Sequence, residues 1–520
     1  MMGFGERLKH RIVLYCGLGI PTILFGVQFS NGSGENFMHL RDNTLFRQQG
    51  YVAGAWIEAD HGGVSIIVNP ATGEVLGQVP ELGVAETRRA IEAAHAALPG
   101  WRALTAQARA VILRRWFNLL LEHQGDLATL MTLEQGKPLA EARGEIAYAA
   151  GFLEWFAEEG RRVYGEVIPP HQADKRVLVL KEPVGVCAAI TPWNFPAAMI
   201  TRKAGAALAA GCTMVVKPAP QTPFSALALA VLAERAGLPA GVLSIVTGPA
   251  QAIGAEILDN PRVRKLSFTG STRTGKYLMQ RCAGTLKRLS LELGGNAPFI
   301  VFDDADLDAA VAGALASKYR NSGQTCVCTN RFLVHEDIYD AFAARLTEGV
   351  REQLKVGNGL EPGVMQGPLI DEAALAKVEE HVADAVAQGA KILTGGRRHA
   401  LGRTFYEPTV LADVTAEMRV AREETFGPVA PLFRFQSDEE AVRLANATEF
   451  GLAAYFYSRD VRRMFRAAEA LQYGMIGVNT GLISTEVAPF GGVKESGFGR
   501  EGSKYGIEEY LDIKYLCIGL

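Results

Sequence analysis

Gly185-Val-Cys-Ala-Ala-Ile190 and Thr213-Met-Val-Val-Lys217 are two short apolar runs, separated by an Ala-rich stretch near residues 197–210. Short apolar runs bounded by turn residues predict buried strands, and the stretch between them has the length and composition of a helix. Two strands joined by a helix form a parallel pair with a right-handed crossover. This segment therefore predicts an open α/β sheet.

The alternation of strands and helices continues on both sides of this segment. On the N-terminal side, residues 85–159 have helical spacing, with breaks expected at Pro99-Gly100 and at Gly136-Lys-Pro138. A second βα series begins after Asn296, and we therefore expect two α/β domains. The other expected elements are strands at 64–73 (ending in a turn), 177–180, 243–246, 265–268, 298–302 and 329–334 and helices at 223–236, 250–259 and 274–282.

The overall composition is that of a globular enzyme of more than one domain. The chain has 520 residues, of which 48% are hydrophobic and 21% charged, and 56 are glycine. A formal net charge of −3 without a basic tract gives no reason to expect a nucleic-acid partner. The seven cysteines follow no disulfide spacing, which favours reduced thiols and a cytoplasmic location. No cysteine pattern indicates a metal site.

The N-terminal extension, residues 1–37, is open to several interpretations. Arg7, Lys9 and Arg11 precede a stretch without charged residues that is apolar as far as Phe29. This pattern resembles a signal peptide or a short membrane anchor over residues 12–29, although Pro21 weakens it as a helix. The alternatives are an ordered extension, or upstream sequence translated ahead of a start at Met38.

Three polar residues in turn-prone segments suggest acyl chemistry on a carbonyl group. Cys326 lies in Asn321-Ser-Gly-Gln-Thr-Cys-Val-Cys328, Glu292 in Leu289-Ser-Leu-Glu-Leu-Gly-Gly295, and Asn194 in Thr191-Pro-Trp-Asn-Phe-Pro196. A thiol can attack a carbonyl, an amide can donate to the resulting oxyanion, and a carboxylate can activate water. Singly, each residue is compatible with a structural role; together they indicate a catalytic centre.

Two further segments suggest a nucleotide site. Phe268-Thr-Gly-Ser-Thr-Arg-Thr-Gly275 joins an expected strand to an expected helix, so its N–H groups and the Ser271 hydroxyl could receive a pyrophosphate. The segment lacks the usual G-x-G-x-x-G pattern, and an ordinary capped turn is the alternative. Lys217 ends another strand, where it could bind ribose or phosphate or remain a solvated lysine.

These motifs, in this order and spacing from about residue 43 onward, resemble the aldehyde dehydrogenase superfamily. Within it, the tracts beginning at Lys217, Gln324 and Ala488 are similar to the bacterial succinate-semialdehyde dehydrogenase branch, which takes part in GABA catabolism. The resemblance implies an aldehyde-dehydrogenase-like α/β fold of two Rossmann-like open domains with a β-ribbon oligomerisation element. The motifs that carry it are Thr191-Pro-Trp-Asn-Phe-Pro196, Lys217-Pro-Ala219, Phe268-Thr-Gly-Ser-Thr272, Leu291-Glu-Leu-Gly-Gly295, Gly323-Gln-Thr-Cys326 and Glu424-Thr-Phe-Gly-Pro428.

The resemblance also implies a role for each matched residue. Cys326 would form a thiohemiacetal and then a thioester, Asn194 would stabilise the oxyanion, and Glu292 would activate the hydrolytic water. Pro220 stands where NAD-preferring relatives often carry Glu, so we expect NADP, with NAD as the alternative. The residues implied to contact the cofactor are Trp193, Lys217, Pro218, Ala219, Pro220, Gly270, Ser271, Leu293, Glu424 and Phe426.

The implied substrate is a small aldehyde that carries a carboxylate. Arg202 and Arg320 match the positions that bind this carboxylate in the resembled branch, and Ser484 matches their hydroxyl partner. Either arginine could instead form a structural salt bridge. Glutarate semialdehyde, one methylene longer than succinate semialdehyde, is the nearest alternative substrate.

Cys328 raises a separate hypothesis about redox control. It lies two residues from Cys326 and could form a strained, reducible disulfide with it; the alternative is a small residue that fills space beside the nucleophile.

The resemblance finally implies a domain organisation and a homodimer or homotetramer. A ribbon would pair with the C-terminal strand near 509–517, and contact between subunits would cover its hydrophobic edge. No membrane partner is expected unless residues 12–29 are a true anchor. The expected ranges are 38–160 with 183–295 for the nucleotide-binding domain, 296–502 for the catalytic domain, and 161–182 with 503–520 for the oligomerisation element.

Overall fold

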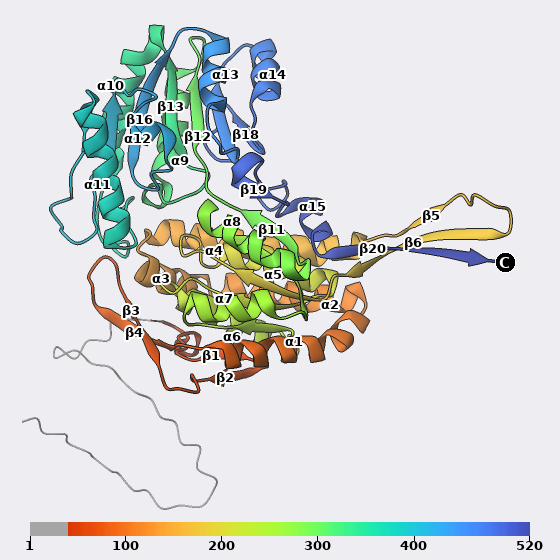
Figure 1. Ribbon diagram of the computed structural model, residues 1–520. Coiled ribbons are helices and arrows are strands. Elements are labelled where there is room, and N and C mark those ends of the chain that lie inside the picture. Colours follow the sequence, from red (N-terminus) through yellow and green to blue (C-terminus); the bar gives the residue numbers. More distant parts are fainter. Residues whose placement is uncertain (1–39) are drawn as a thin grey trace, which may run out of the picture. The chain divides into compact units, whose positions relative to one another are not determined.

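The computed structural model describes residues 40–520, which form two large β-sheets, a three-stranded ribbon and a two-stranded hairpin (Figure 1). The N-terminal extension and its apolar stretch lie outside the described residues. Within residues 40–520, no helix combines the length and the apolar character that a membrane span needs.

The first sheet has eight strands in the order β19-β11-β10-β7-β8-β9-β1-β2. The strands from β11 to β9 are parallel, whereas β1, β2 and β19 pair antiparallel at the edges. β7 and β8 are buried along nearly their whole length, because both faces of the sheet are covered. The predicted parallel α/β sheet is therefore confirmed. The strands are β1 Gly50–Val52, β2 Ala55–Ile57, β7 Val186–Ile190, β8 Thr213–Lys217, β9 Leu243–Ile245, β10 Val263–Thr269, β11 Arg288–Glu292 and β19 Gly497–Phe498.

Helices cover this sheet, and on one side they form a helical layer (Figure 1). The helix expected near 197–210 is α5, which is buried throughout and ends at Gly211 in the left-handed conformation (φ 98°). The helices around this sheet are α1 Val84–Ala103, α2 Ala106–Glu122, α3 Gln124–Gln135, α4 Leu139–Glu159, α5 Ala198–Ala210, α6 Pro223–Arg235, α7 Ala250–Asp259, α8 Thr272–Cys282 and α15 Ser503–Glu508.

The break predicted at Pro99-Gly100 is wrong. Helix α1 continues through Pro99 to Ala103. Its last turn is held by a tertiary contact, because the buried Trp101 indole N–H donates to the Leu208 carbonyl at 3.1 Å. The break predicted at Gly136-Lys-Pro138 does occur, between α3 and α4.

The second sheet has seven strands in the order β14-β15-β16-β13-β12-β17-β18, all parallel except β14. Its strands are β12 Ala297–Val301, β13 Thr329–His335, β14 Lys391–Thr394, β15 Thr409–Ala412, β16 Val429–Phe435, β17 Ala453–Tyr457 and β18 Met475–Val478. Its helices are α9 Leu307–Tyr319, α10 Glu336–Gln353, α11 Glu372–Ala387, α12 Arg419–Arg422, α13 Asp438–Asn446 and α14 Val461–Ala470.

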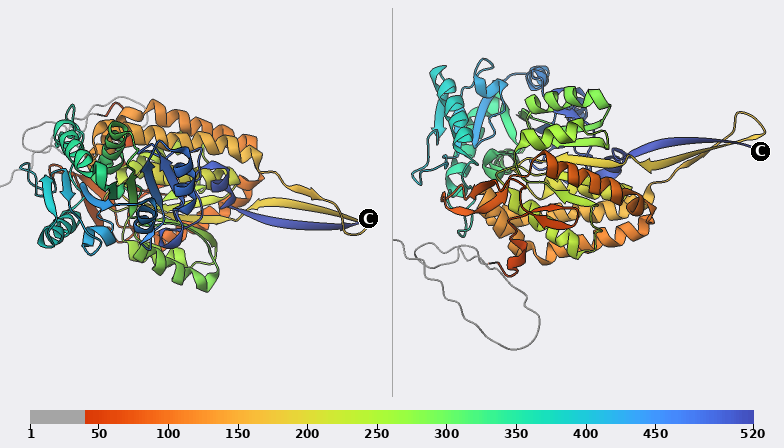
Figure 2. Two further views of the ribbon diagram at one scale, coloured as in Figure 1. Left: turned by 90° about the horizontal axis from the view of Figure 1, so that it is seen from above. Right: turned by 60° about the horizontal axis from the view of Figure 1, so that its bottom comes forward.

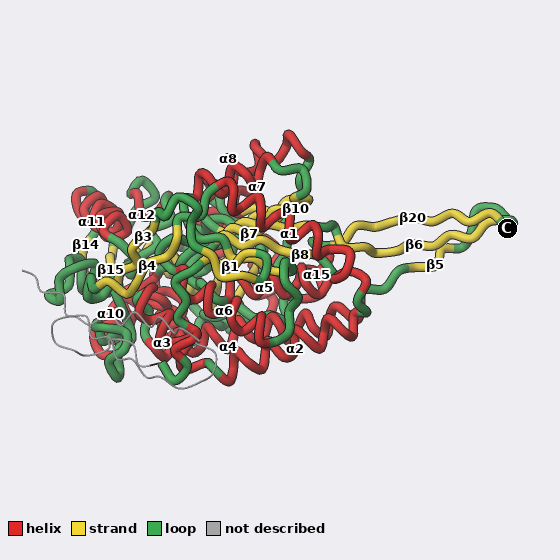
Figure 3. The backbone as a smooth tube through the Cα atoms, turned by 90° about the horizontal axis from the view of Figure 1, so that it is seen from below, coloured by secondary structure: helices red, strands yellow, loops and turns green. Residues whose placement is uncertain are grey.

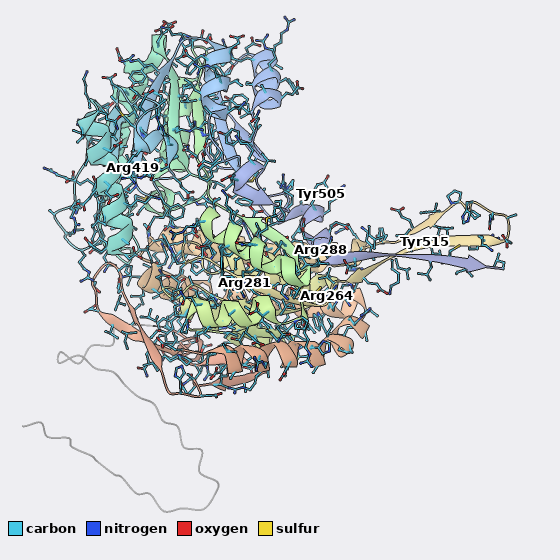
Figure 4. The ribbon with its side chains drawn as sticks, viewed as in Figure 1. Arg264, Arg281, Arg288, Arg419, Tyr505 and Tyr515 are labelled. Carbon is cyan, nitrogen blue, oxygen red and sulfur yellow. The ribbon has the colours of Figure 1, made fainter. Side chains whose placement is uncertain are left out.

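The ribbon combines two segments that are distant in sequence. β20 (Leu511–Gly519) pairs antiparallel with β6 (Lys175–Pro183), which also pairs with β5 (Glu166–Ile168). All three strands extend away from the sheets (Figures 2 and 3), and Tyr515 stands on β20 (Figure 4). The expected pairing of these segments is present within one chain. The remaining hairpin is β3 Val64–Val68 with β4 Val75–Pro80.

Candidate active site

A cavity of about 360 Å³ gathers residues from loops that follow strands of both sheets. Loops at the carboxyl ends of parallel strands are where open α/β folds bind ligands. The cavity wall combines apolar and aromatic side chains with polar and charged groups, as in small-molecule sites. Of the residues predicted from sequence, it brings together Trp193, Asn194, Arg202, Gly270, Ser271, Leu293, Arg320, Cys326, Glu424, Phe426 and Ser484.

Cys326 follows a tight turn that sequence alone could not describe in detail. In the short 3₁₀ segment Arg320–Gly323, Asn321 and Ser322 have φ values of 51° and 56°, and Gly323 has 74°. A side chain at Gly323 would collide with the Gly427 carbonyl, 2.1 Å from the position of its Cβ. Tight packing therefore fixes the turn that presents the thiol.

The Cys326 thiol is half-buried and faces the cavity. Its pKa is raised to about 12, mainly by burial and also by Glu424, while the charge of Arg202 opposes the rise. The resting group is therefore a neutral thiol that must lose its proton when it attacks a carbonyl.

Asn194 lies between the end of β7 and the start of α5 and is 5% exposed. Its side-chain Nδ2 donates to the Gln324 carbonyl at 3.0 Å, two residues before the thiol. One amide hydrogen is thereby used to tie this loop to the Cys326 turn. The second hydrogen on Nδ2 is available to an oxyanion formed in the cavity.

Glu292 ends β11, next to Thr269 of β10, but it is absent from the cavity wall. It is 2% exposed, and neither carboxyl oxygen has a hydrogen-bond partner within residues 40–520. Burial raises its pKa well above the ordinary value, and Glu501 raises it further, against Lys203 and Arg202. In this conformation the surroundings of Glu292 therefore favour the protonated acid, and its side chain does not line the cavity.

The cofactor residues divide into those that line the cavity and those that lie outside it. Gly270 and Ser271 join β10 to α8, and the Ser271 hydroxyl caps this helix by accepting from Thr274 N at 3.4 Å. The Glu424 carboxylate accepts from Gly295 N at 3.0 Å, and burial raises its pKa to about 7. Outside the wall are Lys217, Pro218, Ala219 and Pro220.

Lys217 and the aromatic pair Trp193 and Phe426 fit a dinucleotide. Lys217 is 2% exposed, its ammonium donates to the adjacent Pro218 carbonyl at 2.8 Å, and burial lowers its pKa to about 8. A phosphate would provide the negative charge that this buried ammonium lacks. Trp193 and Phe426 meet edge to face at 5.7 Å beside the thiol, where an aromatic ring can pack.

Residues 56–516 match the model of the aldehyde dehydrogenase family. The chain belongs to this family. A glutarate-semialdehyde dehydrogenase of Pseudomonas aeruginosa is 67% identical over 93% of this chain and 100% of its own length. The NADP(+) succinate-semialdehyde dehydrogenase of Escherichia coli is 66% identical over 93% and 100%. The crystal structure of succinate-semialdehyde dehydrogenase from Burkholderia pseudomallei is 67% identical, covers 92% of this chain and 100% of its own, and has a TM-score of 0.92.

The two arginines of this aldehyde dehydrogenase are placed differently. Arg202 is 1% exposed and its guanidinium contacts Glu501 at 3.2 Å and the Tyr148 hydroxyl at 2.5 Å. Arg320 is partly exposed and packs over the Phe195 ring at 4.7 Å. Within residues 40–520 its guanidinium has no hydrogen bond or ion pair. The group open to a ligand is therefore Arg320, and Ser484 lines the same cavity.

Sequence reasoning missed an ionic cluster behind Glu292. Glu501 accepts from both Arg202 and Lys203, and the Lys203 ammonium also donates to the Thr269 hydroxyl at 2.6 Å. Burial opposes ionisation of Glu501, but the two cations outweigh it and lower its pKa. The sequence signal was weak, since Glu501 lies in a Gly-rich C-terminal segment about 300 residues from its partners.

Cys328 is buried beneath the turn and outside the cavity wall. Its thiol contacts the Gly323 carbonyl at 3.1 Å and the Lys318 ammonium at 3.9 Å. Both Cys326 and Cys328 are free thiols in this structure. A disulfide between them remains a prediction.

Proposed function

We propose that this aldehyde dehydrogenase oxidises succinate semialdehyde to succinate with NADP. The observation that carries the proposal is the Arg320 guanidinium, which lines the same cavity as the Cys326 thiol and has no carboxylate partner within residues 40–520. A free guanidinium near the reacting group favours an aldehyde with a carboxylate at its far end. The names of the two curated relatives, at 66% and 67% identity, keep glutarate semialdehyde as the second candidate.

The proposed mechanism assigns one step to each catalytic residue. The Cys326 sulfur bonds to the aldehyde carbon as the thiol proton passes to water, and the oxyanion of the resulting thiohemiacetal receives hydrogen bonds from Asn194 Nδ2 and the Cys326 backbone N–H. When bound, the nicotinamide would accept the hydride of the aldehyde carbon, so that the adduct on Cys326 is left as a thioester. Glu292, rotated into the cavity and deprotonated, removes a proton from the water that cleaves the thioester. The acid leaves and the free thiol is restored.

The cofactor preference rests on residues 217–220. Lys217 provides a buried cation for the 2′-phosphate of NADP, and Pro220 offers no carboxylate that would repel it. Gly270 and Ser271 at the start of α8 would receive the pyrophosphate, and Glu424 the nicotinamide ribose. Trp193, Leu293 and Phe426 would pack against the cofactor rings.

The ribbon supports a proposed homodimer or homotetramer. Val167 is 79% exposed, Ile513 73% and Tyr515 59%, so a large apolar surface is uncovered in one chain. A second copy would cover it. The free cysteines of residues 40–520 support a proposed cytoplasmic location. The proposed role in GABA catabolism follows from oxidation of succinate semialdehyde and depends on that assignment. The proposed Cys326–Cys328 disulfide can be tested by comparing, in wild type and Cys328→Ala, the inhibition by peroxide and the recovery of activity with a thiol. Identical behaviour of the two proteins would refute the disulfide.

The deciding experiment measures kcat/KM for succinate semialdehyde, glutarate semialdehyde and butanal, each with NADP and with NAD. We expect both carboxylated aldehydes to exceed butanal by at least about tenfold, because a hydrogen-bonded charge contributes about 1.5–3 kcal/mol. A single methylene discriminates between substrates by only about 1–3 kcal/mol. We therefore expect the ratio of kcat/KM for succinate semialdehyde to that for glutarate semialdehyde to be smaller than the ratio to butanal. Equal kcat/KM for butanal would refute the carboxylate site, strong NAD preference would refute the Lys217 argument, and no turnover of any aldehyde would refute the enzyme assignment.

A further inference from the structure

Behind Asn194 lies a buried ion pair that the proposed mechanism does not use. Lys137, in the turn between α3 and α4, and Glu145, on α4, are each 1% exposed at the side chain and form a salt bridge. Buried ion pairs of this kind are costly to desolvate and contribute little net stability unless further hydrogen bonds satisfy them. The remaining contacts of this pair therefore indicate what it does.

Those contacts all reach the loop that carries Asn194. The Lys137 ammonium donates to the Asn194 carbonyl at 2.7 Å and lies 4.0 Å from the centre of the Phe195 ring. One Glu145 oxygen accepts from Ala197 N at 3.0 Å and from Ala198 N at 3.3 Å. The pair thus holds both ends of residues 194–198, because its cation fixes the peptide of Asn194 and its anion fixes the start of α5.

A second donor reaches the same carbonyl from the nucleophile side. Asn321, in the turn before Cys326, donates from Nδ2 to the Asn194 carbonyl at 3.1 Å. The Asn194 side chain in turn donates to the Gln324 carbonyl at 3.0 Å. Hydrogen bonds therefore join the oxyanion donor to the turn that presents the thiol, and Lys137 anchors this unit to the helical layer.

We propose that Lys137 and Glu145 are positioning residues that hold the Asn194 peptide so that its side-chain amide points at the oxyanion formed on Cys326. The inference rests on the proposed role of Asn194. Removal of one oxyanion donor typically costs about 10²–10³-fold in kcat, and small misplacement of such a group costs part of that. Lys137→Met should therefore lower kcat by about 10- to 100-fold.

Glu134 provides a matched control from the same segment. Its buried carboxyl accepts from Phe224 N at 2.8 Å and Ser225 N at 2.7 Å at the start of α6, as Glu145 does at the start of α5. No hydrogen bond from Glu134 reaches residues 191–198 within the described chain. Glu134→Gln should lower the unfolding temperature and leave kcat within about twofold of wild type.

The test is a double-mutant cycle on the full chain. Steady-state kcat and KM are measured with succinate semialdehyde and NADP for wild type, Lys137→Met, Asn194→Ala and the double variant, well below each unfolding temperature. We expect KM for NADP to change less than about twofold. We also expect Lys137→Met to slow the wild type but not the Asn194→Ala background, because coupled residues are non-additive.

The possible outcomes separate the inference from the function on which it rests. Equal fold-losses from Lys137→Met in both backgrounds, or an unchanged kcat in wild type, would overturn the positioning role. If Asn194→Ala leaves kcat unchanged, both the oxyanion assignment and the inference fail. Should Lys137→Met not fold, Glu145→Gln takes its place in the cycle, because it weakens the ion pair and keeps an oxygen for the α5 amides.

Discussion

Arg320→Leu should remove the proposed preference for aldehydes that carry a carboxylate. The Arg320 guanidinium lines the cavity without an ion pair in the described chain, so a bound carboxylate would be its first charged partner. Hydrogen bonds to charged groups contribute about 1.5–3 kcal/mol, and about 1.4 kcal/mol corresponds to a factor of ten. We therefore expect kcat/KM for succinate semialdehyde to fall about 10- to 150-fold, with butanal changed less than about twofold.

The assay follows NADPH absorbance with each aldehyde at matched enzyme concentrations. Arg320→Lys keeps the charge but loses the planar fork, so it should lie between wild type and Arg320→Leu. Arg202→Met is the contrasting variant, because it removes a buried partner of Glu501 and should lower the free energy of unfolding by up to about 3–5 kcal/mol. Equal losses for succinate semialdehyde and butanal in Arg320→Leu would refute the reasoning.

Two further predictions concern protonation. Glu292→Gln should form the thioester but hydrolyse it about 10²–10⁴-fold more slowly than wild type. The assay should then show a burst of about one NADPH per active site. Steady-state turnover equal to that of wild type would contradict this prediction. Because burial raises the Glu292 pKa, its carboxylate fraction grows with pH, so wild-type deacylation should rise with pH and the Gln variant should not follow. The Lys217 ammonium has a pKa of about 8 without cofactor, and a bound phosphate would raise this pKa. Its favourable contribution to NADP binding is therefore complete below pH 8. The contribution is lost as the pH rises from 8 through the higher pKa of the complex. Binding titrations at several pH values should show that the affinity for NADP falls above pH 8 relative to the affinity for NAD. Lys217→Met should abolish this difference. The same pH dependence for both cofactors in wild type would count against the phosphate contact.

The elements predicted best are those whose local sequence decides their structure. β7 and β8 are covered on both faces, so burial required a continuous apolar run that could be recognised directly. The failure at Pro99 has the opposite cause. Trp101 is held by a carbonyl 107 residues away, and this contact keeps the last turn helical where local propensity predicted a break.

The same distinction between local and long-range causes applies to the residues of the active site. Motif residues such as Cys326 and Asn194 could be selected because turn-forming neighbours surround them. The Glu292 conformation could not be predicted, since it depends on burial beside Glu501 and Lys203 from distant segments. The Lys137 contacts were missed for the same reason: Gly136-Lys-Pro138 indicated only a break between helices, and nothing in it shows that the ammonium reaches Asn194.

The protonation states of the cavity bear on how the substrate is chosen. The thiol of Cys326 and the buried acid of Glu292 are both neutral at rest, because burial raises both pKa values. Glu501, which is ionised, is already paired with Arg202 and Lys203. Burial also raises the pKa of Glu424 in the cavity wall to about 7 and that of Glu141 near Arg320, which disfavours their charged forms. Arg320, which forms no ion pair in the described chain, therefore favours an anionic aldehyde before any contact with sulfur is made. Neutralising Arg320 should accordingly slow capture of the carboxylated substrate most at low ionic strength, because screening weakens the same attraction in the wild type.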